Sequence, residues 1–349
     1  FLCAFLLKNK KLRKILLNVF VISSIYLISI SRITLDGARY RNIFVNMAIQ
    51  TTIFKQFNHY GYFLMMSLIC CLGLFMAEKN KFIKTIYLIL YTIIGYALIY
   101  NYTFGCYLAV TIFLIAYSLY AFIRKKDRIH ILVAIVIFVV LSCVTTKNGV
   151  NIAQKNITEF TNDIKSIINK INEVNSENKE QNEIETQKEI NTETAMDITA
   201  DNNEQLEEKK RKEVIENNFQ KAGSFRMQIW LHAIEFILEK PIIGYGPDNL
   251  EGEYLQLRIN QDRPHNLIIY LACVSGIPGM LLYVTAVGII VVKGIKKLFS
   301  NNSEGTIYLI VVITYLISSM FGNSMYYTSP YFFIFLGSLM QCNLIKKEE

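Results

Sequence analysis

Eight long apolar runs limit what this chain can fold into. They occupy residues 15–30, 60–77, 85–102, 104–123, 129–145, 266–292, 306–321 and 330–345. Each is close to the roughly 20 residues that an α-helix needs to cross a bilayer. Hydrophobic residues make up 52% of the chain and charged residues 18%, which is typical of a membrane protein and not of a soluble domain. The sequence therefore predicts an all-α integral membrane protein with about eight transmembrane helices.

Lysines and arginines in the short loops indicate how these helices are oriented, because such residues are retained on the cytoplasmic side. They cluster at residues 8–14, 78–84, 124–128, 293–297 and 346–347 and are absent from the alternate connections 101–103 and 322–329. This pattern predicts a multi-pass protein of the cytoplasmic membrane with both described ends inside. Because the chain opens with FLCAFLL and not with Met, we also expect further spans before it.

The predicted topology divides the chain into three parts. Residues 1–145 form the N-terminal transmembrane helices, residues 146–265 form a large extracytoplasmic loop between the fifth and sixth helices, and residues 266–349 form the C-terminal helices. Within the loop, residues 154–221 are acidic and of low complexity, which favours a dispensable surface insertion. Residues 224–265 form the second half of the loop, which contains a turn punctuated by glycine and proline.

An amphipathic helix is expected at the start of this second half of the loop. One apolar face is predicted to hold Ile229, Trp230, Ala233, Ile234, Ile237 and Leu238. Pro241 ends that helix, and we expect the helix to lie on the outer membrane surface. Further on, GIPG at 276–279 is expected to break the next helix into a short interfacial piece and a true span.

Several classes of function lack their sequence signals. The seven cysteines lie in or beside apolar runs without zinc-site spacing, so we interpret them as small packing residues. A glycine-rich nucleotide fingerprint, a nucleophile elbow and paired metal-ligating histidines are all missing. The sequence therefore predicts no metal and no cofactor. Its basic residues flank membrane spans, which disfavours nucleic acid as a partner.

Arginines on the outer side run against the positive-inside trend and suggest an anionic partner such as a lipid diphosphate. The candidates are Arg32, Arg39, Arg41, Arg226, Arg258 and Arg263. Arg32, Arg39 and Arg41 could each instead bind lipid head groups, and Arg226 could be an interfacial anchor. His265 stands in DRPHNLIIY just before an apolar run, where it could cap a helix or act as a base. Asn266 is the better capping residue.

Two quoted stretches of the outer loop carry a resemblance to a known family. The stretch SFRMQIWLHAIEFILEKPIIGYGPDNL at 224–250, followed by RPHNLIIYLACVSGIPGMLLYV at 263–284, resembles the outer-loop signature of the O-antigen ligase and polymerase superfamily. FNHYGYFL at 57–64 and FGNSMYYTSPYFFIFLG at 321–337 are similar to other segments of the same family.

The resemblance implies a polytopic membrane glycosyltransferase whose donor is an undecaprenyl-diphosphate-linked oligosaccharide and which requires no metal. The resemblance assigns Arg226 and His265 to the active site, so residues 224–265 are the expected active-site loop. The family often has a further arginine where this chain has Phe104, so Arg32 or Arg39 is expected to take its place. Membrane lipids, a flippase and chain-length regulator proteins are the other partners that follow.

The expected chemistry gives these residues their roles. Fixed arginines would stabilise the departing diphosphate, with Arg226, Arg32, Arg39, Arg258 and Arg263 as candidates. A neutral imidazole at His265 would remove the acceptor proton. Asp262 and Glu253 are alternative bases.

A polymerase that builds capsular, exo- or O-antigen polysaccharide is the first reading of these features. A ligase that transfers lipid-linked glycan to lipid A core or protein is the alternative. From another class, a transporter of lipid or polysaccharide is disfavoured because no internal repeat is visible and the charges lie outside the mid-membrane region.

Overall fold

The computed structural model describes most of the membrane part of the chain and the active-site loop. The described residues are 9–37, 57–101, 103–125, 128–147, 150–152, 154, 155, 157, 158, 161, 165, 225–257, 259, 262–298, 303–322 and 328–344. They belong to two units, Phe1–Ala153 with Ala233–Glu349, and Gln154–His232. The predicted insertion at 154–221 lies largely outside the described residues, and the predicted domain boundaries stay a prediction.

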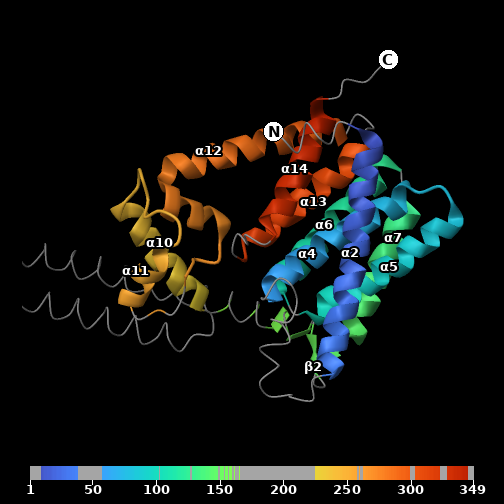
Figure 1. The fold of residues 1–349 in the computed structure, drawn as a ribbon, viewed down its shortest axis with the longest axis horizontal. Coiled ribbons are helices and arrows are strands. Elements are labelled where there is room, and N and C mark those ends of the chain that lie inside the picture. The colour runs from blue at the N-terminus through green and yellow to red at the C-terminus, as the bar shows by residue number, and fades with distance from the viewer. Residues whose placement is uncertain are drawn as a thin grey trace, which may run out of the picture. The chain divides into compact units, whose positions relative to one another are not determined.

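Each of the eight predicted apolar runs coincides with a helix in the described part of the chain (Figure 1). These helices are α2 (Lys10–Gly37), α4 (Phe57–Ala77), α5 (Lys81–Tyr100), α6 (Phe104–Arg124), α7 (Arg128–Val144), α12 (Leu267–Leu298), α13 (Ser303–Ser319) and α14 (Ser329–Leu344). Five of them, α2, α4, α5, α6 and α12, are long and apolar enough to cross a membrane. The predicted helical membrane fold is confirmed at this level.

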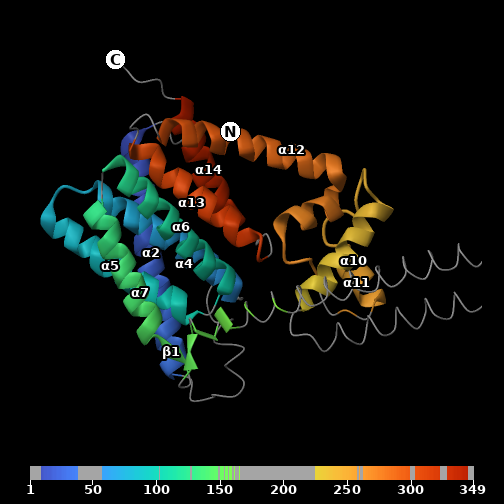
Figure 2. The ribbon, with the colours of Figure 1, turned by 180° about the vertical axis from the view of Figure 1, so that it is seen from behind.

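Helix α4 is the centre around which its neighbours pack. It contacts α2, α5, α6 and α13, as both views of the ribbon show (Figures 1 and 2). Its apolar window is 83% buried, whereas the other four candidate spans are 22–33% buried. Because α4 is apolar all round, it can be enclosed by protein, while each neighbour keeps an apolar face for lipid.

Most cysteines pack inside the protein as predicted. Buried positions are Cys70, Cys71, Cys106, Cys273 and Cys342. Cys71 Sγ donates to the carbonyl of Tyr87 on α5 at 3.1 Å, which joins the two helices. Cys143, near the C-terminal end of α7, is exposed, contrary to expectation. Cys3 lies outside the described residues.

The turn between α4 and α5 is held by two side chains that accept backbone hydrogen bonds. Asn80 Oδ1 accepts from the amides of Phe82 at 2.9 Å and Ile83 at 3.4 Å, which caps α5. Glu78 Oε1 accepts from the amides of Lys79 at 2.9 Å and Asn80 at 3.1 Å. These amides, that of Asn80 first, lower the pKa of Glu78 below its ordinary value.

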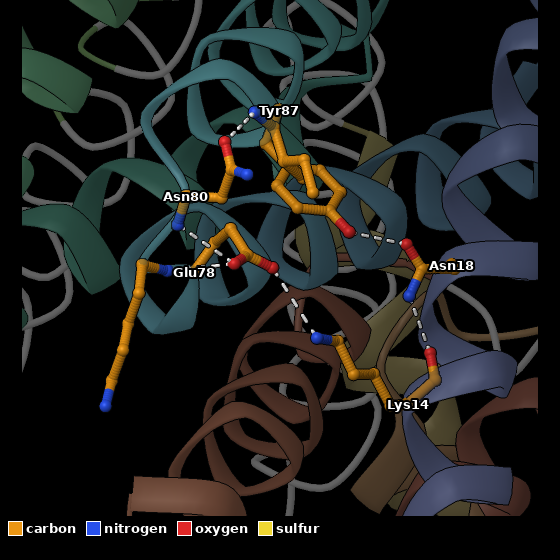
Figure 3. A network of polar contacts seen from close by, with 7 residues as sticks. Lys14, Asn18, Glu78, Asn80 and Tyr87 are labelled. Atoms are coloured by element: carbon orange, nitrogen blue, oxygen red, sulfur yellow. Dashed lines mark hydrogen bonds and ion pairs between the residues drawn. The ribbon is translucent and has the colours of Figure 1, made fainter.

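Helix α2 joins this turn through its polar positions (Figure 3). Lys14 Nζ lies 3.5 Å from Glu78 Oε2, and the hydroxyl of Tyr87 donates to Asn18 Oδ1 at 2.6 Å. Asn18 in turn donates to the carbonyl of Lys14 at 2.8 Å. The network therefore fixes α2 against the α4–α5 pair at the end where the sequence predicts the cytoplasm.

A two-residue hairpin follows α7 at the start of the predicted outer loop. Strand β1 (Thr146–Lys147) pairs antiparallel with β2 (Val150–Asn151). Asn151 Nδ2 donates to the carbonyls of Ser142 at 2.9 Å and Cys143 at 2.8 Å. It thus satisfies carbonyls that the end of α7 would leave without helical partners.

Replacement of the α5 cap tests this local account. Asn80→Ala removes the acceptor for two amides and should lower the free energy of unfolding by about 1 kcal/mol. Thermal unfolding in detergent would measure this, with Lys79→Ala as the neighbouring control. An Asn80→Ala melting temperature equal to that of the control would contradict the capping role.

Candidate active site

The active-site loop contains α10 (Phe225–Glu239) and α11 (Leu250–Gln256). The residues of the predicted apolar face of α10 differ in burial, and the position of this helix on the membrane surface stays a prediction. Ala233 and Phe236 are buried, whereas Ile234 is 47% exposed and Leu238 73% exposed. Phe236 packs against the rings of Tyr245 and Tyr254, with centroids 5.5 and 5.2 Å apart, so its side of the helix faces protein. The apolar residues of α10 therefore form two faces.

The predicted break in α12 lies at Gly276, whose φ of 68° and ψ of 174° are not helical. In an unbroken helix, Cys273 and Val274 would receive hydrogen bonds from Ile277 and residue 278. Ile277 N–H instead donates to Pro241 O at 2.7 Å, and residue 278 is proline, which has no N–H. Both carbonyls consequently need donors from elsewhere.

The segment after α10 supplies those donors. Tyr245 N–H donates to Cys273 O at 2.8 Å, and Gly246 N–H donates to Val274 O at 2.9 Å. A Cβ on Gly244 would lie 2.6 Å from Cys273 O. A Cβ on Gly276 would lie 2.1 Å from the carbonyl oxygen of Ile242. The glycines of PIIGYG and SGIPG thus permit one close backbone contact.

Asn266 caps the first half of α12. Its Oδ1 accepts from the amides of Ile268 at 3.0 Å and Ile269 at 3.2 Å, as the sequence predicted. Its Nδ2 donates to the carbonyl of Met320, after the end of α13, at 3.2 Å. The cap therefore also attaches the beginning of α12 to the bundle.

His265 does not need to cap α12, because Asn266 does. Its backbone has a φ of 51°, in the left-handed region that costs a residue with a Cβ about 1 kcal/mol or more. Such strain is concentrated at functional sites, where the surrounding structure maintains it. Pro264 before it is buried and Asn266 after it is fixed, so the position of the His265 backbone is constrained on both sides.

Arg263 is the candidate arginine whose side chain lies among the described residues. Its Nη2 lies 3.3 Å from Asp248 Oδ1, and its Nε lies 3.2 Å from Asp262 Oδ2. The guanidinium lies over the ring of Tyr270, 5.5 Å from its centroid, and also interacts electrostatically with buried His59 of α4. The arrangement joins the turn after Gly246, the residues before His265 and the first half of α12.

The remaining predicted residues are brought together less closely. Glu253 on α11 acts electrostatically on Tyr245, whose hydroxyl donates to Glu239. Burial first, and then Glu239, raise the pKa of Tyr245. Asp262 is 53% exposed and pairs with Arg263, so its carboxylate is already engaged.

Five candidate arginines cannot be compared with this cluster. Arg226 is the second residue of α10 and Arg32 lies in the last turns of α2, but both side chains lie outside the described residues. Arg39, Arg41 and Arg258 lie wholly outside them. Phe104, where the family arginine was expected, begins α6 and packs against Phe321 with ring centroids 6.3 Å apart.

Sequence reasoning underestimated Asp248, Tyr270 and His59. Asp248 has a φ of 63°, a conformation that Asp tolerates better than most residues, and the preceding glycine-proline pair indicates such a turn. Tyr270 follows His265 by little more than one helical turn. His59 is separated from Arg263 by about 200 residues, and only the packing of α4 brings the two together.

Among the described residues, no group of three His, Cys, Asp or Glu side chains is arranged to hold a metal ion. The chemistry that these residues can offer is that of an imidazole, a guanidinium and two carboxylates beside helix N-termini.

The helices define the chain as a multi-pass membrane protein of the all-α class. A family model described as O-antigen ligase matches residues 86–284, more than half of the chain. The chain belongs to this family, which includes ligases and polymerases of lipid-linked glycans, and the predicted resemblance is confirmed. The match begins in α5, ends in the second half of α12 and contains Arg226 and His265. Among the curated proteins, nothing matches the chain.

Two substitutions at His265 separate backbone strain from side-chain function. The free energy of unfolding should be about 1 kcal/mol larger for His265→Gly than for His265→Ala, because glycine adopts positive φ without strain. His265→Gly should therefore unfold at the higher temperature. Thermal unfolding of the two purified variants in detergent would measure the difference. Equal stabilities would contradict the left-handed backbone at this position.

The backbone contact at the break in α12 can be tested with Gly276→Ala. The added Cβ meets the backbone of Ile242 at a strained φ, so the unfolding free energy should fall by about 2 kcal/mol or more. Gly288→Ala is the matched control on the same helix, since its Cβ would meet nothing within 4 Å. Equal melting temperatures of the two alanine variants would disprove the contact.

Proposed function

We propose that the protein polymerises undecaprenyl-diphosphate-linked oligosaccharide repeat units into capsular, exo- or O-antigen polysaccharide. The reaction takes place on the outer side of the cytoplasmic membrane. The observation that carries this proposal is the family match over residues 86–284, which contains both residues to which the motifs assign catalysis, Arg226 and His265. The lysines and arginines at one set of helix ends support the orientation.

In the proposed reaction, a hydroxyl oxygen of the acceptor sugar forms a bond to the anomeric carbon of the donor. The bond from that carbon to the lipid diphosphate breaks, and the diphosphate leaves with both electrons. His265 Nδ1 or Nε2 takes the hydroxyl proton. A neutral imidazole suits this step because its ordinary pKa lies near ambient pH.

Negative charge grows on the diphosphate as it leaves, and arginine donors stabilise that charge. We assign this role to Arg226 first, with Arg32, Arg39 and Arg258 as further candidates. Arg263 is already paired with Asp248 and Asp262, which a phosphate would have to displace. Its better role is to position the segment before His265, and the same ion pair makes Asp262 a weaker base candidate than His265.

A ligase that transfers the lipid-linked glycan to lipid A core or protein is the second candidate. The description of the matching family favours it. The donor, the leaving group and the proposed roles of Arg226 and His265 would be unchanged, and only the acceptor would differ. A flippase that delivers the donor and proteins that regulate chain length are the partners expected for the polymerase.

Glycan analysis of a strain whose only copy is mutated tests the proposal. His265→Ala and Arg226→Ala should each reduce long polymer by about 100-fold or more, because each removes a group from the transition state. Single lipid-linked repeat units should accumulate while the amount of protein in the membrane is unchanged. Gel electrophoresis of the glycans and immunoblots of the membranes would measure both.

His232→Ala, a histidine on the polar side of α10, is the matched control and should retain normal polymer. Accumulation of full-length polymer on the lipid carrier would identify a ligase in place of a polymerase. Normal glycan ladders in both active-site variants would refute the catalytic assignment.

A further inference from the structure

Two large apolar side chains project from the turn that follows α10. Ile242 is 72% exposed and Ile243 is 81% exposed, and Leu238 one turn earlier is 73% exposed. The turn is closed by a hydrogen bond from Gly244 N–H to Lys240 O at 3.0 Å. Apolar residues exposed together on an ordered turn indicate a contact with something apolar.

This turn directly adjoins a membrane span. Ile277 N–H donates to Pro241 O at 2.7 Å, and the backbone of Ile242 lies against Gly276. From there the exposed apolar surface continues along the second half of α12, where Ile277 is 38%, Leu281 53% and Leu282 73% exposed. Exposed apolar side chains on a membrane-spanning helix face lipid, so the turn is continuous with a lipid-facing surface.

The length of α12 shows at what depth this contact lies. From Ile277 to Leu298 the helix has about 22 residues and is therefore about 33 Å long. That is close to the roughly 30 Å thickness of the hydrocarbon core. Lys296 and Lys297 stand at the far end, where basic residues meet the head groups. Ile277 consequently lies at the opposite boundary of the core, and the Pro241 turn lies beside it.

We propose that residues 241–243 form a wedge that enters the membrane leaflet at the N-terminal end of this span, with Ile242 and Ile243 among the acyl chains. The polar side chains beside this turn suit the head-group region next to the hydrocarbon core. Lys240 Nζ lies 3.8 Å from the centre of the Tyr245 ring, and the Tyr245 hydroxyl donates to Glu239. Aromatic and long charged side chains of this kind anchor proteins at the membrane interface.

The wedge has a consequence for the active-site loop. The amides of Tyr245 and Gly246 donate to carbonyls of α12, and Asp248, which follows in the same turn, pairs with Arg263. A wedge held at the hydrocarbon boundary therefore holds these residues near head-group height. This attachment to the membrane does not depend on which glycan the enzyme transfers.

Depth-dependent fluorescence quenching tests the wedge in the intact protein. A nitrobenzoxadiazole probe is attached to Ile243→Cys, and in a second variant to Ile242→Cys, with Cys3 and the exposed Cys143 replaced by serine. Leu282→Cys on the span and Glu251→Cys on exposed α11 are the matched references. The protein is reconstituted in phosphatidylcholine–phosphatidylglycerol nanodiscs with a nitroxide near the top of the acyl chain.

The lipid nitroxide should quench both turn probes at least about threefold more than the Glu251 probe. The Leu282 probe should be quenched in the same way as the turn probes. Aqueous iodide should quench the Glu251 probe more than the two turn probes. Quenching by iodide equal to that of the Glu251 probe would place the turn in water and overturn the proposal. Protection from both quenchers would place it against protein and overturn the proposal equally. Because no glycan is needed, either failure leaves the proposed polymerase activity untouched.

Discussion

The interrupted hydrogen bonding of α12 at Gly276 is the constraint on which the loop between α10 and α12 depends. Proline at 278 cannot donate to Val274, and Ile277 donates to Pro241 instead of Cys273. A backbone carbonyl left without a donor beside a bilayer costs several kcal/mol. The amides of Tyr245 and Gly246 offset that cost, and by doing so they bind the loop after α10 to a membrane helix. The loop is thus attached through the carbonyls that the break in α12 leaves without helical donors.

The arrangement around His265 follows from this attachment. Between the docked segment and α12, Asp248 meets Arg263, and Arg263 lies over Tyr270. Asn266 joins the same start of α12 to the carbonyl of Met320. His265 therefore lies between residues that are bonded to different elements. Its backbone has a positive φ, which is unfavourable for a residue with a Cβ. This placement supports the proposed role of His265 as a base, because a catalytic residue held in this way loses little orientational freedom when substrate binds.

Much of this could be predicted from local sequence. Apolar runs of bilayer length located the helices because the bilayer itself sets that length. The break at GIPG and the Asn266 cap were predictable because glycine, proline and asparagine act on backbone groups within a few residues. The faces of α10 were not predictable. Ile234 and Leu238 have the same apolar character as Phe236, and only their neighbours decide that Phe236 packs on Tyr245 and Tyr254 while the other two are exposed.

The sequence by itself determined that the chain is a helical membrane protein, where its helices lie and which motifs assign it to its family. Those properties depend on hydrophobicity and on residue types within single segments. Only the tertiary structure decided that Gly244 meets Gly276, that Arg263 pairs with Asp248, that His59 lies within reach of that guanidinium, and that α4 is the enclosed helix. These contacts join residues far apart in the chain, and they form because packed helices must satisfy their backbone groups and bury their apolar surfaces at the same time.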